Sequence, residues 1–125
     1  MSIILAVIVA LQTMPGYPAP TLERWEVIFQ DPRAMVAFDP ENLKKSGPQL
    51  RVLSRARVAE PLAGAATIVM DYLYHCTEKT AQLQGFDTYD ASGKFIDTQK
   101  IALKDSPIEQ VGPDSPNAAI LKRFC

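Results

Sequence analysis

Residues that usually build catalytic and metal centres are scarce in this sequence. Its 125 residues include one histidine and two cysteines, and 13 basic residues nearly balance 14 acidic ones. The motifs C-x-x-C, H-E-x-x-H and G-x-S-x-G are absent, as is a phosphate-binding glycine loop. A net charge of -1 provides no general attraction for nucleic acid. We therefore expect no catalytic residues, no metal ion, no cofactor and no nucleic-acid partner.

Long apolar segments are also missing, apart from one short run near the start. Residues 3–11 are all apolar, but a membrane-spanning helix needs about 20 apolar residues. The run is followed by prolines and a glycine within residues 15–20, and no Lys or Arg precedes it. It resembles the apolar region of a secretory signal peptide. We expect residues 1–20 to be a signal peptide and not a stable membrane span; the alternative is a buried strand or helix of the core.

The remaining residues, 21–125, fit a single domain, because the chain is too short for two cores of ordinary size. Export would place this domain in the periplasm, on the cell surface or in the medium. In such an oxidising compartment we expect Cys76 and Cys125 to form a disulfide. Such a bridge would close a loop of about fifty residues and contribute roughly 4 kcal/mol. Two free thiols, or an intermolecular bridge through Cys125, are the alternatives.

Alternation of polar and apolar residues predicts an antiparallel sheet. Asp31-Pro32 has the composition of a hairpin turn, and residues 39–43 are expected to form one helical turn. A short C-terminal helix should begin at Ser115-Pro116. The predicted fold class is α+β, with this helix packed on a single sheet of about six strands. The strands are expected at residues 24–30, 34–38, 49–59, 67–77, 79–89 and 94–101, with a bulge at Gly85.

A basic stretch between residues 44 and 57 is the feature with most functional content. On a strand, its three arginines would form a positive row about 20 Å long, suited to a sulfated glycan, a lipopolysaccharide phosphate or an acidic protein surface. Ion pairs with Glu26 or Asp71 on neighbouring strands are the ordinary alternative. The candidate binding residues are Lys44, Lys45, Arg51, Arg55 and Arg57.

Neither the histidine nor the acidic residues form a convincing catalytic arrangement. On a strand, Asp71 would lie about 13 Å from His75, and Cys76 would point to the opposite face. We therefore expect His75 to be structural. Carboxylates between residues 87 and 97 suit solvated turns, and a small periplasmic enzyme or enzyme inhibitor that uses this hairpin is the alternative function.

Several short landmarks occur in a recognisable order. They are Trp25, Phe38-Asp39, Tyr74-His75-Cys76, Tyr89-Asp90-x-x-Gly93, Ser115-Pro116 and Cys125. Over residues 24–125 the sequence resembles the bacterial surface-adhesin protein E family. The resemblance implies a curved antiparallel sheet with a packed helix and an extracytoplasmic disulfide at Cys76 and Cys125. The named member is an outer-membrane lipoprotein that binds host matrix proteins, whereas this sequence has no lipidation cysteine.

These observations favour a non-catalytic, exported binding protein of the cell envelope or the medium. It would act through a sheet face or an edge strand, with Arg51, Arg55 and Arg57 as the contact row. The expected partner is an extracellular protein or an anionic glycan. The expected state is a monomer or a weak homodimer.

Overall fold

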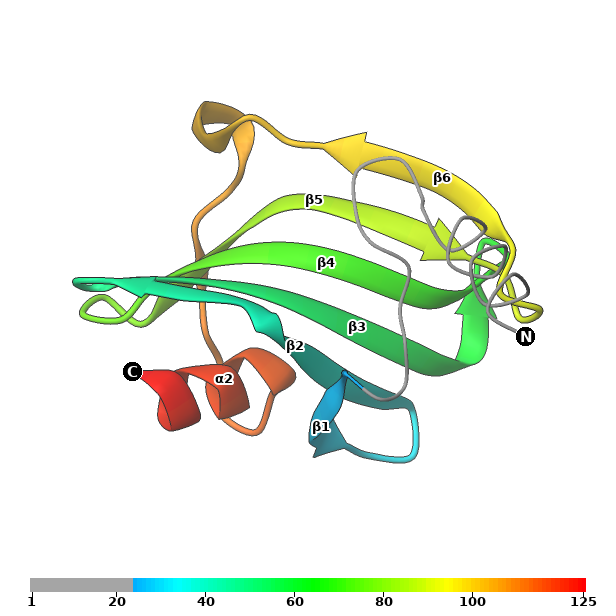
Figure 1. Ribbon diagram of the computed structural model, residues 1–125, viewed down its shortest axis with the longest axis horizontal. Helices are drawn as coiled ribbons and strands as arrows, with labels where there is room; N and C mark the ends of the chain where they lie inside the picture. The colour runs from blue at the N-terminus through cyan, green and yellow to red at the C-terminus, as the bar shows by residue number, and fades with distance from the viewer. Residues whose placement is uncertain (1–23) are drawn as a thin grey trace, which may run out of the picture.

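The computed structural model describes residues 24–125, so the predicted signal peptide at 1–20 lies outside the described residues. Six strands follow one another across a single antiparallel sheet, and a seventh, short strand pairs with the fifth. A 3-10 turn, η1 (Leu103–Asp105), and a C-terminal helix, α2 (Pro116–Phe124), complete the fold (Figure 1). The predicted fold class is confirmed. The strands are β1 (Glu26–Gln30), β2 (Ala34–Ser46), β3 (Gln49–Leu62), β4 (Ala65–His75), β5 (Thr80–Tyr89), β6 (Phe95–Lys100) and β7 (Glu109–Gln110).

Tight turns make neighbours in sequence neighbours in the sheet. Ala63 and Gly64 join β3 to β4 with φ angles of 51° and 83°, because a two-residue hairpin turn of this kind needs two positive φ values. The Asp31 carboxylate accepts hydrogen bonds from the backbone N–H groups of Arg33 and Ala34 at 2.8 and 2.9 Å. The predicted turn at Asp31-Pro32 is therefore present.

The helical turn predicted at residues 39–43 is wrong, because β2 continues through this segment to Ser46. The register of β2 against β3 shifts between Phe38 and Leu43, which marks an irregularity. Asp39 is fully buried there and accepts hydrogen bonds from the backbone N–H of Glu41 and from Asn42 Nδ2. These bonds satisfy the local polar groups without a helix. The register of β4 against β5 also shifts, between Asp71 and Tyr72, and leaves Gln84 unpaired next to Gly85, where the bulge was predicted.

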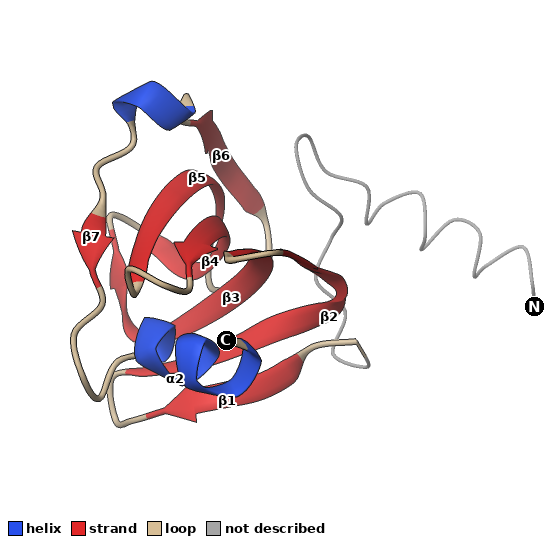
Figure 2. Cartoon of the chain, turned by 90° about the vertical axis from the view of Figure 1, so that its left-hand side faces the viewer, coloured by secondary structure: helices blue, strands red, loops and turns tan. Residues whose placement is uncertain are grey.

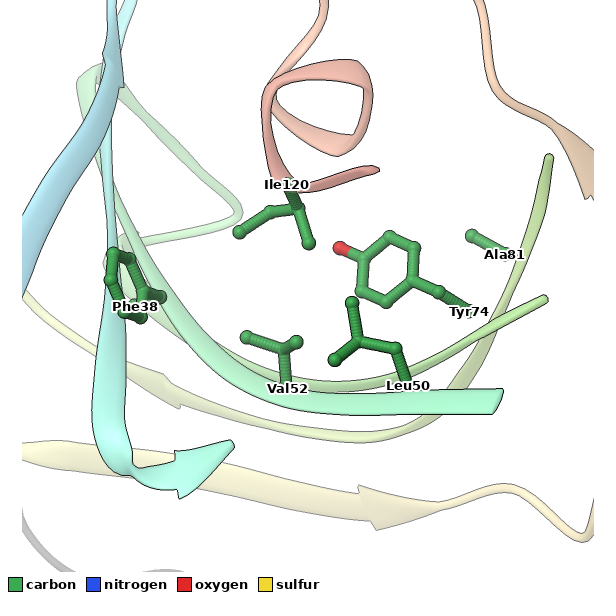
Figure 3. Packing of buried hydrophobic residues seen from close by; sticks show 6 residues of the cluster. All are labelled: Phe38, Leu50, Val52, Tyr74, Ala81 and Ile120. Carbon is green, nitrogen blue, oxygen red and sulfur yellow. The ribbon is translucent and has the colours of Figure 1, made fainter. Parts of the chain in front are cut away.

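The sheet is curved, and α2 lies against its concave face (Figure 2). Figure 3 shows how Ile120 of α2 points toward side chains of the strands. The Tyr74 hydroxyl donates to Asn117 Oδ1 at 2.7 Å, and the Phe38 and Phe124 rings meet edge to face at 5.0 Å. The buried members of this inner cluster are Phe38, Leu50, Val52, Tyr74, Ala81 and Ile120.

The opposite, outer face of the sheet carries a second apolar cluster. Successive strand residues point to opposite faces, so Leu53 lies on the outer face while its neighbour Val52 belongs to the inner cluster. The sheet therefore buries apolar side chains on both of its faces. The outer cluster consists of Trp25, Ala37, Leu53, Val69 and Tyr89, with Phe95 packed against it.

A disulfide joins the residue after β4 to the end of α2. Cys76 and Cys125 are bonded, with their Cα atoms 5.5 Å apart, and residues 24–125 contain no free cysteine. At the other end of α2, Ser115 Oγ accepts a hydrogen bond from the backbone N–H of Ala118, and Pro116 is the first helical residue. The predicted disulfide and the predicted start of the helix are confirmed.

Candidate functional site: the basic end of the sheet

Lys44 and Arg51 lie side by side near the turn that joins β2 to β3. They are directly opposite each other in the register of these strands, while Lys45 lies opposite Leu50. Lys44, Lys45 and Arg51 are all exposed. No ion pair within residues 24–125 involves Lys44 or Lys45. Because successive strand residues point to opposite faces, Lys44 shares a face with Arg51, whereas Lys45, the next residue of β2, projects from the other face with Leu50.

Arg51 is held by a carboxylate on the next strand. Its Nε and Nη2 atoms lie 3.2 and 2.8 Å from the two carboxylate oxygens of Asp71. This is the ion pair foreseen as the alternative to a binding role. Because 56% of the Arg51 side chain is exposed, the pair contributes only about 0–1 kcal/mol. The guanidinium remains accessible at the surface.

Arg55 and Arg57 continue on the same face but differ in exposure. Arg55 is 7% exposed, and its guanidinium carbon lies 5.2 Å from the centre of the Trp25 ring. Burial, assisted by the nearby charge of Arg57, lowers the pKa of Arg55. Arg57 is exposed. The three arginines therefore share a face without forming a continuous exposed row, and the binding role of the five residues stays a prediction.

The acidic hairpin does not bring its carboxylates together. Asp87 lies opposite Thr98, whereas Asp97 lies opposite Thr88, so the two carboxylates project from opposite faces of the sheet. Asp90 instead accepts hydrogen bonds from Ser92 and Lys94 within its own turn, and these bonds lower its pKa. The arrangement does not support the alternative enzyme or inhibitor function.

Asp87 is an unexpected feature of the outer face. Its side chain is fully buried, and neither carboxylate oxygen has a well-aligned hydrogen-bond partner among residues 24–125. Burial raises the pKa of Asp87, although the nearby Thr98 hydroxyl and the charge of Lys100 oppose the rise. Burial, together with the charge of Asp87, raises the pKa of Tyr89 to about 12. Nothing in the sequence distinguished Asp87 from the solvated carboxylates around it.

His75 occupies a structural position. Its Nε2 atom lies 2.8 Å from Gln82 Oε1, and Gln82 Nε2 donates to the backbone carbonyl of Ser106 at 3.1 Å. This chain of contacts connects β4 and β5 to the segment after η1. Asp71 is engaged by Arg51 instead, and residues 24–125 contain no cluster of His, Cys, Asp or Glu suited to a metal ion.

The complete arrangement is a curved antiparallel sheet with a C-terminal helix tied to its fourth strand. The model of the family described as surface-adhesin protein E matches residues 25–125. The chain belongs to the surface-adhesin protein E family. This membership confirms the resemblance and implies an exported or surface location. No curated protein and no solved structure matches the chain significantly.

This family member has no helix within residues 24–125 that is long and apolar enough to cross a membrane. It does have surface grooves that the sequence did not reveal. One, of about 730 Å³, lies beside the disulfide; we call it the disulfide groove. Another, of about 700 Å³, lies between the β1–β2 turn, the end of β3 and residues 114–116. Sequence reasoning missed both because each is assembled from segments far apart in the chain.

Proposed function

We propose that this protein is an exported, non-catalytic binding protein that contacts an anionic extracellular partner through the basic end of its sheet. Membership of the surface-adhesin protein E family supports a binding role outside the cell. The disulfide supports export, because such bonds persist in oxidising compartments and are rare in the cytosol. The partner would be an acidic protein surface or an anionic glycan.

The observation that carries this proposal is the exposed pair of Lys44 and Arg51, with exposed Lys45 next to Lys44 on the opposite face of β2. Asp71 neutralises Arg51, while the two lysines have no ion-pair partner within residues 24–125. Adjacent exposed cations raise the local positive potential even though the net charge of the chain is only -1. A partner that carries negative charge would therefore be attracted to this end of the molecule.

Heparin, a sulfated glycan, is a suitable probe for isothermal titration calorimetry. We expect binding that weakens steeply as salt rises, because exposed charges are screened over about 10 Å at 0.1 M ionic strength. The Lys44→Gln/Lys45→Gln variant should lose about tenfold in affinity, equivalent to about 1.4 kcal/mol. The matched control is Lys94→Gln/Lys104→Gln, which removes two exposed lysines elsewhere and should change affinity by less than about twofold.

The proposal fails if the Lys44→Gln/Lys45→Gln variant retains full affinity or if the control loses as much. Export has a separate test, which is mass spectrometry of the native product after alkylation without reduction. We expect a chain that lacks residues 1–20 and carries no alkylated cysteine. Recovery of an uncleaved chain with two alkylated thiols would contradict export.

A further inference from the structure

The disulfide groove has the size and the walls of a binding site. Its volume of about 730 Å³ falls within the range of roughly 300–1,000 Å³ that is usual for ligand sites. Its lining residues come from the turn after β4, from the chain after β7 and from α2, three segments that can be followed in Figure 1. Apolar surface is supplied by Val111, Pro113, Ala118 and Leu121 together with the disulfide.

Both charged residues of the disulfide groove are positive. Lys79 comes from the turn before β5 and Lys122 from the last turn of α2, and both are exposed. Neither forms an ion pair within residues 24–125, and the lining contains no Asp or Glu. Two unneutralised ammonium groups beside an apolar wall are complementary to a ligand that carries both carboxylates and apolar side chains.

The walls of the groove are held in place by several independent connections. The disulfide fixes the end of α2 to the end of β4, and the backbone N–H of Val111 donates to the carbonyl of Lys79 at 3.3 Å. Gln110 pairs with Thr80, which fixes the segment after β7 against β5. A groove that is already formed costs less free energy to occupy, because little ordering accompanies binding.

We propose that the disulfide groove binds an extended, acidic segment of a partner protein. An apolar side chain of that segment would pack against Leu121, and its carboxylates would pair with Lys79 and Lys122. The exposed lysines, which come from two separate segments of the lining, favour a peptide that passes through the groove over a small molecule enclosed within it. This site is separate from Lys44 and Lys45, so it extends the proposed function and does not depend on it.

A fluorescein-labelled peptide of sequence Asp-Leu-Asp-Leu-Asp is the probe, with Lys-Leu-Lys-Leu-Lys as the charge-reversed control. Fluorescence anisotropy of the full chain should show saturable binding of the acidic peptide alone. Amide chemical shifts should change at Val111, Ala118 and Leu121. The Lys79→Asn/Lys122→Gln variant should weaken binding at least tenfold. Asparagine is chosen because Lys79 has a φ of 57°, a conformation that asparagine tolerates.

Lys94→Gln/Lys104→Gln again serves as the matched control and should bind the acidic peptide normally. An unchanged affinity of the Lys79→Asn/Lys122→Gln variant would overturn the proposal, as would equal binding of the basic peptide. Dodecanoate bound in the groove in the absence of peptide binding would assign the site to a small amphiphile and would also overturn it. Loss of heparin binding in the Lys44→Gln/Lys45→Gln variant concerns the basic end alone, so the two proposals fail separately.

Discussion

Removal of the disulfide offers the sharpest test of how α2 is held. Cys76 and Cys125 are 49 positions apart, and the chain-entropy relation gives a loop of this length a stabilisation of about 4 kcal/mol. Domains of this size are stable by only about 5–15 kcal/mol in total. We therefore expect the Cys76→Ala/Cys125→Ala variant to lose about 4 kcal/mol in free energy of unfolding, with a melting temperature lower by roughly 10–20 °C.

The loss of stability should first affect the C-terminal end of α2. The helix has nine residues, and helices of this length are marginal in water without tertiary contacts. Near its start, Asn117 accepts a hydrogen bond from Tyr74, and Ile120 is 1% exposed in the inner cluster. Without the disulfide, the contacts after Ile120 include the edge-to-face packing of Phe124 on Phe38 and the exposed ion pair of Arg123 with Glu26. The last turn should therefore fray before the first.

Urea denaturation measures the loss of stability, and amide hydrogen exchange locates it. Amides after Ile120 should lose protection in the Cys76→Ala/Cys125→Ala variant, while those of β3 and β4 keep theirs. Reduced wild-type protein is the internal control, because it should match the variant and the variant should not respond to reductant. A variant within about 1 kcal/mol of the oxidised wild type would refute the chain-entropy argument.

Two further predictions concern buried side chains. Asp87→Asn should raise the free energy of unfolding at pH 7 by about 1–3 kcal/mol, because burial of the ionised carboxylate outweighs the opposing effects of Thr98 and Lys100, and no group of residues 24–125 forms a well-aligned hydrogen bond to it. The folded state raises the pKa of Asp87 above its ordinary value of 3.8, so this cost is absent below pH 3.8, grows as pH rises from 3.8 toward the raised value, and stays constant above it. Urea titrations should show a smaller gain in the free energy of unfolding for Asp87→Asn at about pH 4 than at pH 7. The control, exposed Asp97→Asn, should stay within about 0.5 kcal/mol of the wild type. In the same assay, Ile120→Ala should lower the free energy of unfolding by about 2–5 kcal/mol, because it leaves a cavity in the inner cluster. The control, exposed Lys122→Ala, should be nearly neutral. A small effect of Ile120→Ala would contradict the packing of α2.

The order of the strands follows from local signals in the sequence. Alternating residues and turn chemistry placed the hairpins correctly, and the Ser115-Pro116 pair marked the start of α2. The prediction of a helical turn at residues 39–43 was wrong because an aspartate before a proline is equally suited to start a helix or to close a local turn. Residues 43–46 pair with residues 49–52 of β3. This pairing between strands, which the local sequence does not encode, makes the segment a strand.

The sites depend on contacts that local signals do not contain. Arg55 had the sequence context of an exposed strand residue, yet Trp25, thirty positions earlier, lies against its guanidinium. Asp87 resembled its solvated neighbours, yet it is fully buried on the outer face. Exposure of a charged strand residue therefore could not be predicted from alternation alone.

Occupation of both sheet faces restricts where a partner can bind. The inner face holds α2 and its cluster, and the outer face holds the cluster around Trp25, so the apolar centres of both faces are buried. The ends of the hairpins remain available for contact with a partner. The backbone N–H of Cys76 donates to the carbonyl of Pro48 at 2.7 Å, which places the β2–β3 turn beside the disulfide. Lys44 and Lys45, which precede this turn, therefore lie toward the end of the molecule that carries the disulfide groove, although they do not line it.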